Sequence, residues 1–175
     1  MTTTEAPRPR DITLRFLAEP TDVNFGGKVH GGAVMKWIDQ AGYACAVGWS
    51  GYYCVTVYIG GIRFYKPIFI GQIVEVKATV VHTGTSSIHI AVDASATDPK
   101  TRARKRTTRC LIVFVAVDAG GDTVAVPSWA PVTDQDRQAE QYARGMAALR
   151  SEQEDQLVAM DVVCESATHG EPATS

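Results

Sequence analysis

The chain contains one long helix-like segment, and almost all of the chain after it reads as strand. Within residues 31–48, apolar side chains recur at the spacing of one face of an α-helix. These side chains are Val34, Ile38, Ala41 and Cys45. Residues 52–117 instead alternate or form short apolar runs, which is typical of strands. A single helix that must bury one face against several strands predicts an α+β domain, with the helix packed on a curved antiparallel sheet.

The strand-like stretches are separated by turn residues. We expect them at residues 12–20, 54–64, 72–82, 87–97 and 110–118. Gly60 and Gly61 predict a bulge within the second stretch. The continuous apolar run of the last stretch predicts a strand that is covered on both faces, and a basic stretch leads into it.

The composition changes after Pro131, where the chain becomes charged and helix-favouring. A thin apolar stripe of Tyr142, Met146 and Leu149 continues through this part. We therefore divide the chain into four regions. They are a flexible N-terminus at 1–10, a folded domain at 11–130, a helical extension at 131–160 and a disordered tail at 161–175.

Composition excludes several classes of protein. A formal net charge of -2 over 175 residues argues against a general nucleic-acid binder. The four cysteines form no CxxC pair, so a zinc site is not expected, and three of them lie in apolar segments as buried free thiols do. No apolar run has the length of a secretory signal or the roughly 18 residues of a membrane span. We expect a cytoplasmic protein that does not bind membranes.

The helix begins in an unusual way. A glycine-rich loop leads into it, and no Ser, Thr, Asp or Asn stands at the capping position before Gly31. Its first backbone N–H groups therefore lack an obvious side-chain acceptor, and such groups at the positive end of a helix dipole bind anions. A carboxylate, Asp39, follows two turns later on the same helix. A site for an electrophile and a base on one rigid element is what acyl transfer needs.

These residues resemble a known family. The segment Asn24-x-x-Gly27-x-Val29-His30-Gly31-Gly32 with Asp39, the segment 63–67, the turn at 82–87 and the strand ending at 114–118 resemble the hotdog-fold acyl-CoA thioesterases, specifically the acyl-CoA hydrolase branch with the YciA-type enzymes. The resemblance covers roughly residues 12–127. It implies a helix wrapped by a sheet, dimers that share active sites at their interface, and assembly into tetramers or hexamers. It also implies a hydrolase of fatty acid metabolism that needs no cofactor, with CoA as part of substrate and product.

The resemblance assigns roles to individual residues. It makes Asp39 the catalytic carboxylate and Asn24 its polar partner from the opposite subunit. We expect a backbone N–H at His30, Gly31 or Gly32 to hold the thioester oxygen. The residues expected to line the substrate or bind CoA are His30, Lys66, Thr83, Gly84, Thr85, Ser86, Arg104 and Arg106.

Each residue also has a plainer interpretation. Asp39 could be an acid on the flank of an amphipathic helix, and Asn24 a turn former. The glycines could serve close packing of helix and sheet, and residues 100–109 could be a solvated basic edge. His30 is a candidate base by residue type, whereas the resemblance gives it a lining role.

Three other functions are also compatible with the sequence. A dehydratase or hydratase of the same fold needs a catalytic histidine, and His30 is the one near the helix start. A non-enzymatic module could bind or sense acyl-CoA without turnover. A nucleic-acid binder would use residues 100–109, although no aromatic side chains are interleaved there. A thioesterase acting by general-base catalysis or through a mixed anhydride is the function that we favour.

Overall fold

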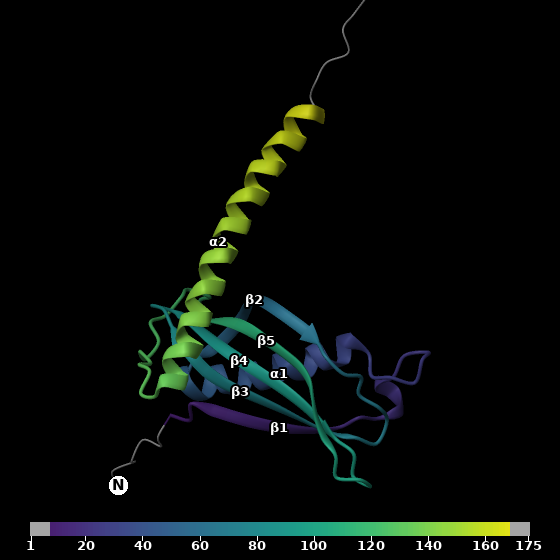
Figure 1. The fold of residues 1–175 in the computed structure, drawn as a ribbon. Helices are drawn as coiled ribbons and strands as arrows, with labels where there is room; N and C mark the ends of the chain where they lie inside the picture. The colour runs from purple at the N-terminus through teal and green to yellow at the C-terminus, as the bar shows by residue number, and fades with distance from the viewer. Residues whose placement is uncertain (1–7, 169–175) are drawn as a thin grey trace, which may run out of the picture.

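A computed structural model describes residues 8–168, and it describes side chains as far as residue 156. Its elements follow one another along the chain as shown in Figure 1. They are β1 (Asp11–Leu17), the short 3-10 helix η1 (Pro20–Asp22), α1 (Gly31–Ser50), β2 (Tyr53–Phe64), β3 (Ile73–Thr83), β4 (Ser87–Thr97), β5 (Arg104–Val117) and α2 (Asp134–Thr168). The predicted helix and all five predicted strands are present, with small differences at their ends.

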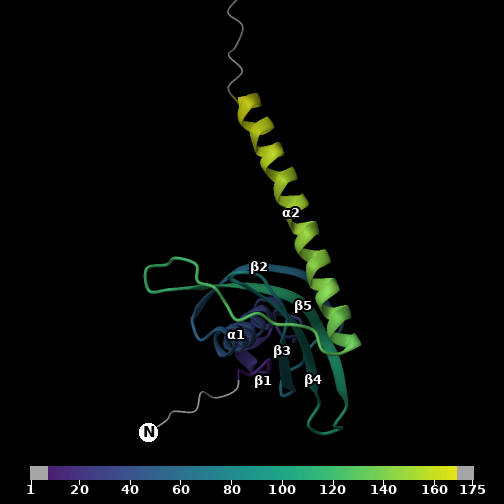
Figure 2. The ribbon, with the colours of Figure 1, turned by 90° about the vertical axis from the view of Figure 1, so that its left-hand side faces the viewer.

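The strands form one antiparallel sheet in the order β1-β3-β4-β5-β2. The sheet curves around α1, which lies against its inner face (Figure 2). The register between β2 and β5 shifts twice, between Thr56 and Tyr58 and again between Gly60 and Arg63. Gly61 has a φ of 62°, a value that favours glycine. The predicted bulge is therefore confirmed, and it bends β2 where the sheet wraps the helix.

The main core lies between α1 and the sheet. The predicted stripe of Val34, Ile38, Ala41 and Cys45 is fully buried there. Gly42 adds the closest approach, since a Cβ on it would lie 2.8 Å from Cε2 of Phe114. Burying a side chain as large as Ile38 stabilises the fold by about 1.5–3 kcal/mol, so this stripe fixes where α1 lies.

β5 is covered on both faces, as its continuous apolar run predicted. Phe114 and Ile112 belong to the core around α1, whereas Leu111 packs on the outer face with Ala143 of α2. The strand begins at Arg104, so half of the basic stretch belongs to it rather than leading into it. The outer face of the sheet tolerates these charges because acidic residues of β3 and β4 pair with them.

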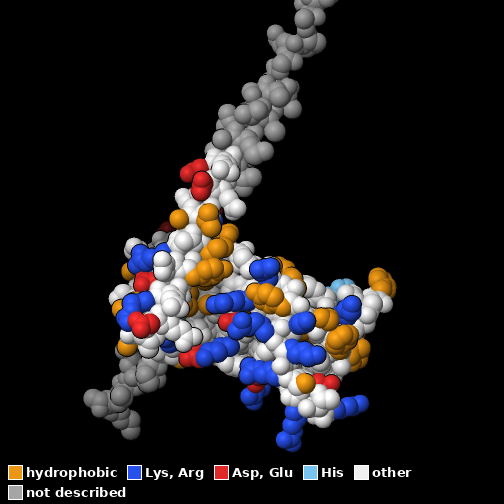
Figure 3. Space-filling view, viewed as in Figure 1, with side chains coloured by type: hydrophobic (Ala, Val, Ile, Leu, Met, Phe, Trp, Pro, Cys, Tyr) orange, Lys and Arg blue, Asp and Glu red, His pale blue; other side chains and the backbone are white. Residues whose placement is uncertain are grey.

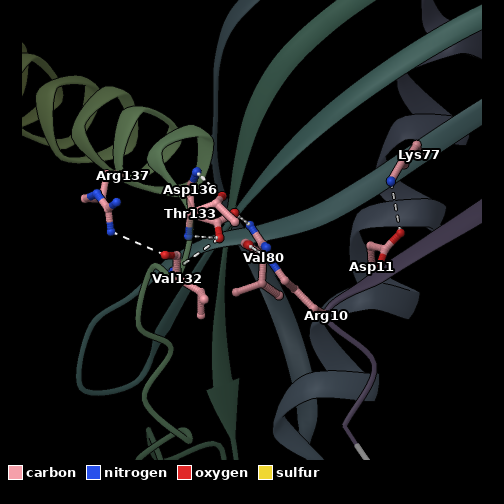
Figure 4. Close-up of polar contacts among 8 residues, drawn as sticks. All are labelled: Arg10, Asp11, Lys77, Val80, Val132, Thr133, Asp136 and Arg137. Carbon is pink, nitrogen blue, oxygen red and sulfur yellow. Dashed lines mark hydrogen bonds and ion pairs between the residues drawn. The ribbon is translucent and has the colours of Figure 1, made fainter.

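A network of polar contacts attaches α2 to the N-terminal segment (Figure 4). The Asp136 carboxylate accepts hydrogen bonds from the backbone N–H groups of Val132 and Thr133 at the helix start. It also forms an ion pair with Arg10 at 2.6 Å, and the Arg10 Nε donates to the Val80 carbonyl at 3.1 Å. Arg10 lies in the region expected to be flexible, and these contacts hold it in place.

The ends of the chain differ from the prediction in a second respect. α2 continues to Thr168, past the expected boundary at 160, so residues 161–168 are helical rather than disordered. The remaining parts of the two regions predicted to lack order, residues 1–7 and 169–175, lie outside the described residues. Among the residues that are described, no helix is both long enough and apolar enough to cross a membrane.

Candidate active site

Asp39 lies on the side of α1 that faces β2, and it is half-buried. Its Oδ1 accepts a hydrogen bond of 2.6 Å from the Thr56 hydroxyl of β2. This bond fixes one carboxylate oxygen and leaves the other available to a ligand or to water. Thr56 could not be predicted from the sequence, because its contact with Asp39 depends on the position of β2 relative to α1 and not on a local pattern.

β2 is an edge strand, since its partner in the sheet is β5 on one side alone. Its open edge runs beside exposed aromatic and aliphatic side chains from β2 and from α1. These are Met35, Tyr43, Tyr53, Val57 and Phe64. A long apolar edge of this kind is a template for pairing with another chain. Asp39 and Thr56 therefore lie next to the surface at which a second chain is most readily added.

The N-terminus of α1 leaves backbone donors available. His30 is the N-cap residue, and its side chain makes no capping hydrogen bond. Within residues 8–168, no acceptor is present for the N–H groups of Gly31 and Gly32. Gly31 lines a cavity of ≈ 320 Å³. The predicted free N–H groups are therefore present, and the N–H of Gly31 lies beside a space that could hold a carbonyl group.

This cavity collects several of the predicted residues. Asn24, Gly31 and Lys66 line it, and Asp39 does not. Residues that the sequence analysis had not singled out for it also contribute. They are Lys28, Val29, Val34, Phe64, Tyr65, Pro67, Ile68 and Thr108. In one protomer, the N-terminus of α1 and Asn24 therefore line the same cavity. Asp39 and Thr56 do not line it.

Asn24 has the turn-forming role that the plainer interpretation gave it. Its Oδ1 accepts hydrogen bonds from the backbone N–H groups of Gly26 at 2.9 Å and Lys28 at 3.3 Å. The next residue along, Phe25, is completely exposed at the tip of this loop. Asn24 therefore stabilises a projecting loop through its oxygen, while its amide N–H groups remain available as donors at the cavity.

Three lysines lie at this cavity or beside it, and Lys28 is one that lines it. Lys66 lines the large cavity and also a small neighbouring one of ≈ 70 Å³, which Lys105 lines as well. Lys105 pairs in register with the buried Ala96, on the inner side of the sheet. Lys105 was not among the residues expected from the sequence to bind CoA.

Arg104 and Arg106 lie on the outer face of the sheet. Arg104 contacts Ser95 at 2.9 Å and Glu75 at 3.0 Å, and Arg106 pairs with Asp93 at 3.3 Å. The two arginines share one face, as their alternate spacing predicts. That face is opposite to the one on which α1 packs.

The turn between β3 and β4 lies far from the cavity in the same protomer. Ser87 pairs with Val115 on β5, whereas Phe64 at the cavity pairs with Thr108. Those seven residues of strand correspond to roughly 23 Å. Polar groups of the turn also form hydrogen bonds within the protomer. Thr83 Oγ1 accepts one from the Trp129 N–H, and the Thr85 carbonyl accepts one from the Val126 N–H. Gly84 and Ser86 are held in the same way by backbone bonds to Ser87 and Ala116.

His30 is exposed at the start of α1, and its backbone N–H donates to the Asp22 carbonyl at 2.7 Å. The described cysteines, Cys45, Cys54 and Cys110, are free and buried, as predicted. Burial raises the pKa of Cys45 and of Cys110 to about 12, so neither is a nucleophile at neutral pH. No cluster of side chains that could hold a metal ion occurs among the described residues.

Comparison with known proteins places this geometry in a family. Residues 26–103 match the model of the thioesterase superfamily. The acyl-CoA thioester hydrolase YciA of Escherichia coli K12 is 34% identical over 131 residues, which is 73% of this chain and 98% of YciA.

Solved structures agree with this assignment. An apo-hexameric acyl-CoA thioesterase superposes with a TM-score of 0.79 at 27% identity, over 85% of this chain and 96% of its own. A variant of HI0827 with an aspartate replaced by alanine superposes with a TM-score of 0.63 at 28% identity, over 77% and 95%. HI0827 is described as a hexameric broad-specificity acyl-coenzyme A thioesterase. From its fold and these relatives, the chain belongs to the hotdog-fold thioesterase superfamily and is homologous to the YciA acyl-CoA thioester hydrolases.

Proposed function

We propose that this protein hydrolyses acyl-CoA thioesters to a free carboxylic acid and CoA, with Asp39 as the catalytic carboxylate. The observation that carries the proposal is the 2.6 Å hydrogen bond from Thr56 to Asp39 Oδ1 beside the open edge of β2. A half-buried acid that a neighbouring hydroxyl holds in one orientation suits a group that must act on a bound substrate. The relatives that are named as acyl-CoA thioesterases support the choice of substrate class.

In the general-base route, Asp39 Oδ2 accepts a proton from water while the water oxygen attacks the thioester carbonyl carbon. The carbonyl oxygen becomes negative, and the N–H groups of Gly31 and Gly32 stabilise it. The C–S bond then breaks, and CoA leaves as a thiolate that takes up a proton. In the alternative route, Asp39 attacks the carbonyl carbon directly and water hydrolyses the mixed anhydride that forms.

The complete site requires two protomers. Asp39 lies at the β2 edge, whereas Asn24 and Gly31 line a cavity that does not include it. Antiparallel pairing of two β2 edges brings the cavity end of one protomer's strand toward the opposite end of its partner's. Asn24 of one protomer then serves the Asp39 of the other, and the exposed Phe25 beside it is covered. Hexameric relatives support further association of such dimers.

The nucleotide end of CoA requires cationic groups outside the reacting centre. Lys28 and Lys66 line the large cavity, and Lys66 shares the small neighbouring cavity with Lys105, so these three lysines are the best-placed candidates. Contacts of CoA with Arg104, Arg106 and the turn at 83–86 remain predictions. Within one protomer these residues lie on the outer face of the sheet or at its far end, so they would have to serve a site formed with another subunit.

The decisive experiment is a thiol-release assay over a panel of acyl-CoA chain lengths. Turnover that Asp39→Ala abolishes, with binding of CoA retained, is the expected result. Subunit exchange between inactive Asn24→Ala and Asp39→Ala chains should restore part of the activity, because one site in each mixed dimer regains both residues. A parent that is fully active as a monomer in sedimentation would contradict the shared site.

The same assays distinguish the other functions. A sensing module would bind acyl-CoA tightly and release no thiol. A hydratase would convert crotonyl-CoA. Of the three histidines in the described part of the chain it would need His30, because His82 and His89 lie on the other side of the sheet beneath α2. Steeply salt-dependent retention on DNA would indicate a nucleic-acid binder.

A further inference from the structure

α2 packs on its own domain along only part of its length. Ala139, Ala143 and Met146 contact the outer face of the sheet near Val81 and Leu111. Beyond this contact the helix passes over the β2 edge and projects clear of the sheet in both ribbon views (Figures 1 and 2). Helix formation in water is weak without a packed face, so the projecting part of a 35-residue helix needs a partner that its own domain does not supply.

The described part of α2 carries an apolar groove of ≈ 470 Å³. Its lining residues are Tyr142, Gly145, Met146, Ala148, Leu149 and Glu152. Tyr142 and Leu149 are about half exposed, at 48% and 55%. Between them, Gly145 has no atom within 4 Å of the position of a Cβ. Two large apolar side chains that flank small ones form the knob-and-hole surface on which another helix packs.

The groove is continuous with the open edge of the sheet. The Tyr142 hydroxyl lies 3.0 Å from the position of a Cβ on Gly61 in β2. The Arg150 guanidinium lies over the ring of Tyr58 in β2, 5.3 Å from its centre. Hydrophobic side chains gather along this part of α2, directly above the sheet (Figure 3). A second chain that pairs with β2 therefore arrives next to the groove.

We propose that α2 of a second copy fills this groove, so that the two helices cross antiparallel over the paired β2 edges and clamp the dimer. This inference rests on the β2 pairing of the proposed function and adds a second contact to it. A two-fold axis normal to the joined sheet relates the copies. It therefore makes the two projecting helices run in opposite directions along the same face. The surface is self-complementary, because Leu149 of one helix can fill the space at Gly145 of the other.

Charge also favours the antiparallel arrangement. After Arg150 the helix contains five acidic residues and no Lys or Arg: Glu152, Glu154, Asp155, Asp161 and Glu165. Parallel helices would place these two acidic halves side by side, which is unfavourable. In the antiparallel crossing, each acidic half instead extends over the partner's outer sheet face, where Lys and Arg side chains are numerous (Figure 3).

Cysteine cross-linking tests the contact directly. Ala148 lies near the middle of the groove, so in a two-fold contact it faces its own copy across the axis. The matched control is Glu154→Cys on the opposite side of the same helix. Both variants also carry Cys164→Ser, so that a disulfide between two α2 helices can form only through the introduced cysteine. We expect mild oxidation to link most Ala148→Cys chains into covalent dimers and to leave Glu154→Cys chains largely monomeric on denaturing gels.

The outcomes separate this inference from the proposed function. A parent that sediments as an active dimer, together with variants that fail to cross-link or cross-link equally, overturns the helix contact and leaves the shared site intact. An active monomer overturns both.

A second measurement uses dilution of the full-length protein. Leu149→Glu should raise the concentration at which activity falls to half by roughly tenfold or more, as loss of a central contact does. Val132→Glu changes a residue that is 81% exposed outside the groove, and it should leave that concentration unchanged. Equal behaviour of the two variants would also overturn the contact.

Discussion

The two long helices of this molecule differ in how much of their surface is buried against the rest of the protomer. α1 has buried residues on every turn and carries Asp39 on its remaining face. Along the described side chains of α2, only Asp136 and Ala143 are buried, and the large apolar side chains of Tyr142 and Leu149 face outward. A helix that is held by the core along its whole length gives a catalytic side chain a fixed position. A helix with an unpartnered stripe is instead available for contact with another molecule.

The largest effect is expected on kcat when Asp39 of α1 is changed, and it tests whether α1, and not α2, carries the catalytic group. Asp39→Asn removes the charge at nearly constant shape and should lower kcat by ~10²–10⁴-fold, because the amide cannot accept the proton or attack the carbonyl. Steady-state thiol release and thermal unfolding are the measurements. Asp134→Asn, an exposed acid in the first turn of α2, serves as the control and should keep parent activity. Comparable losses of kcat in both variants would show that catalysis does not depend specifically on the carboxylate of α1.

A pH titration examines the contact between α2 and the sheet. Burial is the main cause that lowers the pKa of His89 from 6.5 to about 4, and the neighbouring His82, Arg150 and Arg144 lower it as well. The unfolded chain therefore takes up a proton near pH 6.5 while the folded chain takes it up near pH 4. Stability from this group is full above pH 6.5 and is lost as the pH falls toward 4, by about 3 kcal/mol.

Urea unfolding of the parent and of His89→Gln between pH 7 and pH 4 measures this loss. The parent should lose more stability than the variant over that range, because the variant has no ring to protonate. If the free energy of unfolding depends on pH in the same way in both proteins, protonation of His89 beneath α2 does not destabilise the fold.

A smaller effect is expected at the closest packing of α1. Gly42→Ala places a methyl group 2.8 Å from Phe114 and 3.1 Å from Ile112. The overpacking costs about 1–3 kcal/mol, and the better helix propensity of alanine offsets up to about 1 kcal/mol of it. We expect a net decrease in the free energy of unfolding, measured in urea. Unchanged stability would show that α1 is less tightly held than its burial indicates.

The smallest effect concerns the start of α2. Hydrogen bonds from the Thr133 backbone N–H, and next the side chain of Arg10, hold the pKa of Asp136 well below its ordinary value. Asp136→Ala removes these contacts, and hydrogen–deuterium exchange should then be faster at 134–150 than in the parent. Exchange in α1 should not change. Faster exchange in both helices would mean that they unfold as one unit.

The sequence predicted most of the fold because burial on one face imposes a period on the residues. The stripe from Val34 to Cys45 and the alternation of the strands both arise in this way. The pattern failed where a face is exposed. The basic residues at the start of β5 were placed before the strand because they lack its apolar run, and the end of α2 was predicted to be disordered because no core marks it.

The candidate site was predicted in part. The uncapped N–H groups and Asp39 could be read locally, since both belong to one helix. Thr56 could not, because its hydrogen bond depends on the register of a strand that is distant in sequence. Asn24 illustrates the reverse case, because its oxygen accepts hydrogen bonds from Gly26 and Lys28 in a local turn, whereas the motif assigned this residue to the active site.

The ion pair between Arg10 and Asp136 joins the segment before β1 to the start of α2. Arg10 also lies over the ring of Trp129, and its carbonyl accepts from Val80 in the middle of the sequence. Contacts between such distant residues close a very large loop and give the fold a high contact order, which slows folding. During synthesis, the segment before β1 cannot reach its final place until residue 136 has left the ribosome. A chain that stops short of α2 can still pair β1 with β3 and bond Arg10 to Val80, but it lacks the carboxylate that holds the Arg10 guanidinium.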